Sequence, residues 1–219
     1  TQKTGFLIVG ISWLVMSLVG ALPFWISGEV PSYIDALFET ASGFSTTGAT
    51  IIENVEVLSK SLLFWRSFTH WIGGMGVLVF IMAILPLSDS RSFQIMRAET
   101  PGQKKSKLVA KLRSTALILY GIYIVLTVIE TILLLCGGLS FFDSITTAFA
   151  TAGTGGFSVL NSGVSGYQST YVNIVLAVFM FLFGINFNLY FLILLGDIKQ
   201  ILKNSELKWF VSIVLVSAA

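Results

Sequence analysis

The sequence predicts an all-α polytopic membrane protein, built from repeated units of spanning helix, short re-entrant helix, loop and spanning helix. Three observations support this fold class. The chain is 55% hydrophobic and 11% charged, with a mean hydropathy of +0.87, whereas soluble proteins average roughly a quarter charged residues. Apolar stretches long enough to cross a bilayer alternate with polar connections. A loop rich in threonine and glycine also occurs twice.

Composition excludes several classes of function. A net charge of +2 in 219 residues is too small to indicate nucleic-acid binding. The single cysteine, Cys136, cannot form an intrachain disulfide, and the single histidine, His70, leaves no zinc-type cluster. Because His70 lies in a predicted membrane segment without an acid partner, we expect neither a Ser-His enzymatic site nor a cofactor.

The first predicted spanning helix covers residues 5–26. Its apolar run is longer than the roughly 7–15 residues of a signal peptide and matches the about 20 residues that cross a bilayer. The chain starts at Thr1 rather than at methionine, and it stops inside an apolar run, residues 209–219, that is too short to span. We therefore expect a piece of a longer protein.

A short helix and a polar loop come next. Ser32 can cap the helix, and Asp35 completes a capping box. If the helix ends at Phe44, its dozen residues cover about 18 Å, against about 30 Å of hydrocarbon. Such a helix enters the membrane and stops partway. Its C-terminal dipole favours a cation at residues 45–50, Ser-Thr-Thr-Gly-Ala-Thr.

The apolar stretch 62–87 begins with Arg66 and His70 beside two tryptophans. We interpret both side chains as headgroup-level or loop-supporting residues rather than as residues that contact an ion. Further along, Gly73, Gly74 and Gly76 favour close helix packing, with a flexible hinge as the alternative.

Charge asymmetry predicts the topology. Residues 88–113 hold seven basic residues against two acidic ones, whereas residues 27–60 hold five acidic residues and one lysine. By the positive-inside rule the first segment is cytoplasmic and the second lies outside. The short helix and its loop therefore face outside.

The second half of the chain repeats the first at an offset of 108 residues. A predicted span at 114–136 leads to another capped helix start and another loop, Thr-Gly-Gly-Phe-Ser at 154–158. The offset places Ser32 on Ser140, Asp35 on Asp143, Thr46 on Thr154 and Gly48 on Gly156. An offset of 113 pairs residues 43–45 with 156–158 but breaks the capping match, so we prefer 108.

The last predicted span, 171–195, contains Gly184, Asn186 and Asn188, and at most one of the two asparagines faces a pore because they lie on different helix faces. Glu130, deep in the span at 114–136, either bonds a neighbouring helix or contacts an ion. The predicted organisation is a first pore repeat at 1–87, a basic cytoplasmic linker at 88–110 and a second pore repeat at 111–202. Residues 203–219 form a linker and the start of a truncated third repeat.

The two loops have the chemistry of an ion site. Glycine reaches positive φ and can turn its carbonyl where other residues resist. Rings of such carbonyls replace the hydration shell of the ion in potassium-channel filters. A surface turn is the alternative for either loop alone, but the repetition favours a potassium-channel-like pore.

The two loops, together with Phe-Gln-Ile-Met-Arg-Ala-Glu-Thr-Pro-Gly at 93–102, closely resemble the membrane subunit of Trk-type potassium uptake systems, in the Trk/Ktr/HKT superfamily. The resemblance covers essentially the whole chain. It implies four units around one pore, two helices ahead of the first unit, a homodimer and a cytosolic nucleotide-binding regulatory subunit. The last two units, with the gating loop of the third, are not in this sequence, so gating residues are not assigned.

The resemblance implies that potassium is the transported ion and that this multi-pass protein lies among the lipids of the cytoplasmic membrane. It places the potassium sites, formed mainly by backbone carbonyls, at Thr46, Thr47, Gly48, Thr154, Gly155 and Gly156. Two alternatives remain. The chain could be a non-conducting assembly subunit whose re-entrant loops are structural, or a sodium-permeable member of the superfamily. The coupling ion and the regulatory ligand stay open.

Overall fold

The computed structural model describes residues 2–76, 105–194, 196 and 204–218. Every regular element within these ranges is a helix, which confirms the predicted all-α class. Residues 77–87 of the apolar stretch 62–87, most of the basic linker and the segment 93–102 lie outside the described residues.

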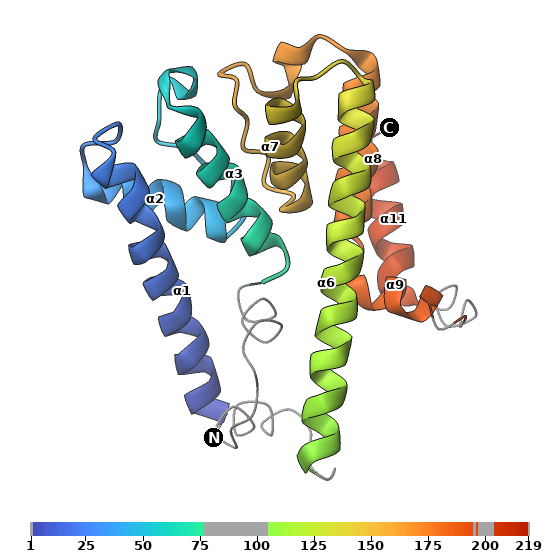
Figure 1. Cartoon of the computed structure of the whole chain (residues 1–219). Helices are drawn as coiled ribbons and strands as arrows, with labels where there is room; N and C mark the ends of the chain where they lie inside the picture. Colours follow the sequence, from blue (N-terminus) through green and yellow to red (C-terminus); the bar gives the residue numbers. More distant parts are fainter. Residues whose placement is uncertain (1, 77–104, 195, 197–203, 219) are drawn as a thin grey trace.

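The first unit contains three α-helices, α1 (Gln2–Ile26), α2 (Tyr33–Phe44) and α3 (Lys60–Gly74). The short helix α2 packs against both α1 and α3 (Figure 1). A single turn of 3-10 helix, η1 (Val55–Val57), lies on the connection between α2 and α3. A core centred on Phe24, Ala36 and Leu62 holds the unit together, since burial of apolar side chains drives such packing.

The second unit contains α6 (Lys105–Cys136), α7 (Phe141–Ala152), the 3-10 helix η2 (Gly163–Tyr167) and α8 (Thr170–Gly184). Both short helices have 12 residues. They begin at 33 and 141 and end at 44 and 152, so both ends are offset by 108. The structure therefore confirms the preferred register of the repeat.

Capping fixes the start of both short helices. The Ser32 hydroxyl accepts a hydrogen bond from the Asp35 amide at 3.3 Å, and the Ser140 hydroxyl accepts one from the Asp143 amide at 3.1 Å. A serine in this position satisfies one of the free amide groups of the first helical turn. Both predicted caps are confirmed.

The prediction of one continuous span at 171–195 is wrong. Helix α8 ends at Gly184, and a separate helix, α9 (Phe187–Leu194), turns away from it (Figure 1). Ile185 is extended between them, with ψ of 140°. The Tyr190 hydroxyl donates to the Leu182 carbonyl at 2.8 Å and so satisfies a group near the end of α8.

Helix α11 (Ser205–Ala218) runs beside α8 and contributes to the break. Its Glu206 carboxylate accepts a hydrogen bond from the Asn186 side-chain amide at 3.1 Å, and Phe210 stacks on Phe181 with ring centroids 5.3 Å apart. The Asn186 side chain thus bonds to another helix instead of lying free on the surface of a continuous span.

Helix lengths agree with a membrane protein whose short helices stop partway. Among the described residues, Ala116–Cys136 in α6 is long and apolar enough to cross a bilayer, while α1 and α8 contain shorter apolar runs, Gly10–Ile26 and Thr170–Gly184. At about 1.5 Å per residue, α2 and α7 each reach about 18 Å, well short of a span.

Small residues allow close approach at two of the three predicted glycines. A Cβ on Gly73 would overlap the Phe44 carbonyl oxygen, and one on Gly74 would lie 2.5 Å from the Tyr123 hydroxyl. Packing is therefore the role of these two glycines. At Gly76, whose φ is +76°, no described residue lies within 4 Å of such a Cβ, so close packing is not observed there.

Aromatic packing joins the two units. Phe149 of α7 lies against Phe64, Phe68 and Trp71 of α3, with ring centroids 5.5 to 5.7 Å apart. This contact places α2 and α7 in the same half of the molecule (Figure 1). The loops that follow the two helices consequently meet.

Candidate functional site

The candidate site consists of loop 1, residues 45–50, and loop 2, residues 153–158. The loops touch: a Cβ on Gly48 would overlap the Gly155 carbonyl oxygen, and a Cβ on Gly155 would lie 2.8 Å from the Thr46 carbonyl oxygen. The absence of side chains at both positions permits this approach. All six predicted site residues are therefore brought into one pair of facing loops.

Both loops share an unusual alternation of backbone conformation. In loop 1, φ is +54° at Thr46 and +76° at Gly48, whereas φ of Thr47 between them is not positive. In loop 2, φ is +52° at Thr154 and +84° at Gly156, again with a residue of negative φ between them. Each position matches its counterpart at the offset of 108.

Positive φ at the two threonines is costly. A β-branched residue in the left-handed region is a genuine outlier, of the order of 1–3 kcal/mol, and it persists only where the surroundings impose it. Such strain concentrates at functional sites. Its presence at Thr46 and Thr154 alike marks this conformation as a shared requirement of both loops.

The two short helices end directly in the loops. The Thr46 amide donates to the Gly43 carbonyl at 3.0 Å, and the Thr154 amide donates to the Thr151 carbonyl at 2.8 Å. Each loop thus begins on the last turn of its helix, where the partial negative charge of the helix dipole is greatest. A cation at these helix ends stays a prediction from the sequence.

Side-chain hydroxyl groups shape loop 1 as well. The Ser45 and Thr47 hydroxyl oxygens lie 2.7 Å apart, and the Ser42 hydroxyl donates to the Ala49 carbonyl. None of the six predicted site residues is buried in this chain. A hollow of about 520 Å³ between α1 and α2 reaches Ser45 and Thr47.

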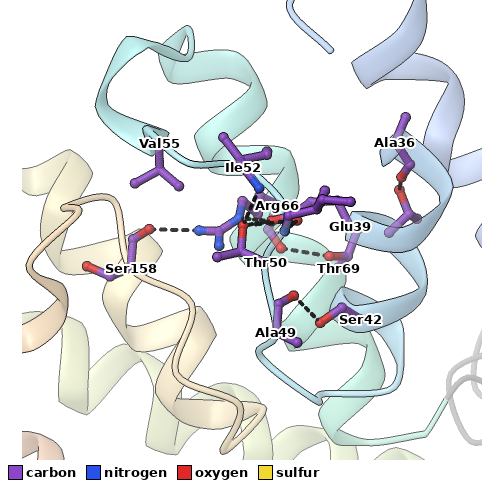
Figure 2. Close-up of polar contacts among 12 residues, drawn as sticks. Ala36, Glu39, Ser42, Ala49, Thr50, Ile52, Val55, Arg66, Thr69 and Ser158 are labelled. Atoms are coloured by element: carbon purple, nitrogen blue, oxygen red, sulfur yellow. Dashed lines mark hydrogen bonds and ion pairs between the residues drawn. The ribbon is translucent and has the colours of Figure 1, made fainter. Parts of the chain in front are cut away.

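Arg66 lies inside the protein rather than at its outer surface, and its loop-supporting interpretation is confirmed. Arg66 is only 3% exposed and forms an ion pair with Glu39 of α2, which is 1% exposed (Figure 2). Its guanidinium also donates to the Ser158 carbonyl of loop 2 at 2.7 Å. In the sequence, Glu39 is one of the five acidic residues of the outer segment 27–60, and no local pattern predicts this role.

His70 likewise supports loop 2 from within the protein. It is fully buried, and its ring lies 4.0 Å from the ring of Phe157, centroid to centroid. A Cβ on Gly155 would overlap the imidazole, and one on Gly153 would lie 2.7 Å from the His70 carbonyl oxygen. Among the described residues, neither ring nitrogen has a hydrogen-bond partner.

Glu130 lies beside the second short helix rather than in the loops. It is fully buried, and its carboxyl is close to the Thr151 hydroxyl of α7, which itself donates to the Thr147 carbonyl at 2.9 Å. Neither carboxyl oxygen of Glu130 has a hydrogen-bond partner within the part of the chain that the structure describes. Glu130 thus lies against α7, but the predicted hydrogen bond to a neighbouring helix is not formed among the described residues.

A further link between the units lies outside the loops and was not expected from sequence. The Asn161 side chain accepts from the Val55 amide at 2.8 Å and donates to the Asn54 side chain at 2.7 Å, and the Asn161 amide donates to Glu56 at 2.9 Å. Since the partners are more than 100 residues apart, no local pattern could have revealed them.

Two short helices that end in facing loops of matched, alternating backbone define the class: a helical membrane protein with repeated pore-helix units. Comparison with known proteins places the chain within that class. The TrkH family, described as "Cation transport protein", matches residues 1–213. The chain belongs to this family.

Individual relatives agree. The chain is 38% identical over 216 residues to the "Trk system potassium uptake protein TrkH" of Escherichia coli (strain K12), covering 97% of this chain and 44% of that protein. It is 38% identical over 151 residues to the "Uncharacterized cation transporter MJ1485" of Methanocaldococcus jannaschii, covering 69% of this chain and 31% of that protein.

A solved structure is also similar. The crystal structure of the potassium transporter TrkH from Vibrio parahaemolyticus superposes with a TM-score of 0.79 at 31% identity, covering 99% of this chain and 44% of that chain. The chain thus spans less than half the length of these relatives. The match confirms the predicted family and fold class.

Proposed function

We propose that this chain supplies two of the filter loops of a potassium uptake protein. The observation that carries the proposal is the alternation of φ at residues 46–48 and 154–156, repeated at the offset of 108. Carbonyl groups on such a backbone can be directed toward a dehydrated cation, as in potassium-channel filters. The ion would be held mainly by the carbonyls of Thr46, Thr47 and Gly48 in loop 1 and Thr154, Gly155 and Gly156 in loop 2.

The named relatives are a potassium uptake protein and a potassium transporter. Their names support potassium rather than sodium as the ion that the proposed filter selects. The test is uptake of rubidium, a potassium analogue, by the full-length protein that contains this chain, in bacteria that lack their own potassium uptake. We expect saturable uptake that potassium inhibits at much lower concentration than sodium. Equal inhibition by sodium would support a sodium-permeable member, and absence of uptake from a well-expressed protein would support a non-conducting subunit.

Family membership also supports placement in the cytoplasmic membrane, assembly as a homodimer and a cytosolic nucleotide-binding partner. These proposals concern the whole protein, of which this chain is a part. Cross-linking in membranes would test the dimer, since a product at twice the monomer mass is expected. Co-purification of the full-length protein from its own cells would test the regulatory subunit, and its absence under mild detergent would count against it.

A further inference from the structure

The ion pair between Glu39 and Arg66 is buried, and a buried ion pair needs more than its own attraction to be stable. Arg66 Nε donates to Glu39 Oε1, and both side chains are almost completely removed from solvent. The loss of hydration of two charges is offset only when their remaining donors and acceptors are also satisfied. The groups that satisfy them belong to the two loops.

Loop 1 satisfies Glu39. The Thr50 hydroxyl lies 3.0 Å from both carboxylate oxygens, and the Ile51 amide donates to Oε2 at 3.1 Å (Figure 2). Thr50 is the last residue of loop 1, two positions after Gly48. The carboxylate therefore holds the exit of this loop against α2.

Loop 2 satisfies Arg66. Its Nη1 donates to the Ser158 carbonyl at 2.7 Å, and the centre of the guanidinium lies 3.6 Å from the centroid of the Phe157 ring. Ser158 is the last residue of loop 2, and the offset of 108 makes it the counterpart of Thr50. The ion pair consequently binds the same position in both loops.

The repeat itself does not require this pair. The offset of 108 places Thr147 opposite Glu39, and the Thr147 hydroxyl lies 3.1 Å from the hydroxyl of Tyr167. When α3 and α8 are aligned at their N-caps, Ser59 and Ser169, the counterpart of Arg66 is Leu176. In the part of the chain that the structure describes, the arrangement thus occurs once, at the boundary between the units.

We propose that Glu39 and Arg66 are positioning residues that fix the exits of loops 1 and 2 relative to each other, and that this spacing sets the preference for potassium over sodium. The inference rests on the proposed function of the loops. Discrimination between two ions depends on a small difference in binding free energy, so a filter must be held by rigid neighbours. The ion pair supplies such a support to both loops at once.

The main test removes both charges together in the full-length protein. Glu39→Leu combined with Arg66→Met leaves no unpaired charge, and apolar replacement of a whole buried ion pair is often neutral for stability. We expect parental membrane expression and melting temperature. The ratio of sodium to potassium inhibition constants, measured by rubidium uptake, should fall about tenfold, which corresponds to about 1.4 kcal/mol. A stable double variant with the parental ratio would overturn the proposal.

A milder pair of variants decides the matter if the double variant is not expressed. Thr50→Val keeps the shape of the side chain but removes the hydroxyl that bonds to Glu39, whereas Thr50→Ser keeps the hydroxyl. We expect a several-fold lower ratio for Thr50→Val at an unchanged melting temperature, and the parental ratio for Thr50→Ser. Equal ratios in the two variants would contradict the proposal.

The controls separate this inference from the proposed function. Glu29→Gln removes an acidic residue of the first unit that bonds to the Ser59 amide and touches neither loop, so the parental ratio is expected. Substitution of Gly48 tests the filter itself. If that variant loses selectivity and the ion-pair variants do not, the loops form the filter but the ion pair does not tune it. If neither has an effect, the proposed function fails as well.

Discussion

Gly48 in loop 1 lies directly against the backbone carbonyl oxygen of Gly155 in loop 2. The two residues belong to different repeat units, and the contact is possible because Gly48 has no side chain. The loops therefore form one continuous surface rather than two separate turns. We therefore expect a change in the backbone of either loop to displace the other.

Substitution of Gly48 should be the most damaging change in the loops. In Gly48→Ala, the added methyl group would overlap the Gly155 carbonyl oxygen, and the residue would keep a φ of +76° at a cost of about 1–2 kcal/mol. The loops must move apart, so we expect loss of potassium preference by tenfold or more. Competition of sodium with rubidium uptake measures the effect. Parental competition in an expressed variant would show that the contact is unimportant for the pathway.

Gly156 offers a test of backbone strain without steric overlap. Its φ is +84° and the position of a Cβ is open, and Gly163, with φ of +64° and equally open space, is a matched control outside the loops. Gly156→Ala and Gly163→Ala should each lower the free energy of unfolding by about 1 kcal/mol. Only Gly156→Ala should weaken potassium preference. Equal potassium preference in the two variants would show that loop 2 is not part of the filter.

Charge asymmetry gives a prediction of topology. Val57 lies in the connection after loop 1 and is 73% exposed, so Val57→Cys should react with an impermeant thiol reagent on intact cells. Ser106→Cys, in the basic connection, should react after the cells are opened. Both changes are made in a Cys136→Ser background, because Cys136 is an exposed free thiol. Reaction of Ser106→Cys on intact cells would show that the chain has the opposite orientation in the membrane.

Glu130 should tolerate loss of its acidic group. The residue is fully buried against α7 and contributes nothing to the loops, so an amide of the same shape should preserve packing. We expect Glu130→Gln to keep parental expression and uptake within about twofold, whereas Glu130→Lys should prevent stable insertion because it buries an unpaired charge. Loss of uptake by a well-expressed Glu130→Gln would assign the carboxyl a role in ion movement.

Periodicity and spacing within the sequence were sufficient to predict the two short helices and their repetition. Ser32 and Ser140 cap their helices because a hydroxyl at that position satisfies free amides within the same turn. The offset of 108 followed from the same local signals and predicted which threonines and glycines would be equivalent. Such features depend on residues close together in the chain.

The break in the last span at Ile185 was not predicted. Apolar residues lie on both sides of Gly184 and Asn186, so hydropathy predicts one continuous run. The break is stabilised by a contact with another helix, between Asn186 and Glu206. A pattern based on hydropathy records the length of an apolar run, but it does not record which neighbouring helix competes for a backbone or side-chain group.

The sequence by itself determined the membrane class, the two capped short helices, the repeated loops and the family. Only the tertiary structure decided that the loops touch at Gly48 and Gly155, and that Arg66 is buried between them with Glu39 as its partner. The physical reason is distance along the chain. Caps and helix lengths depend on neighbours within a few residues, whereas contacts between residues 27 or 107 positions apart exist only after helices pack and remove these groups from water.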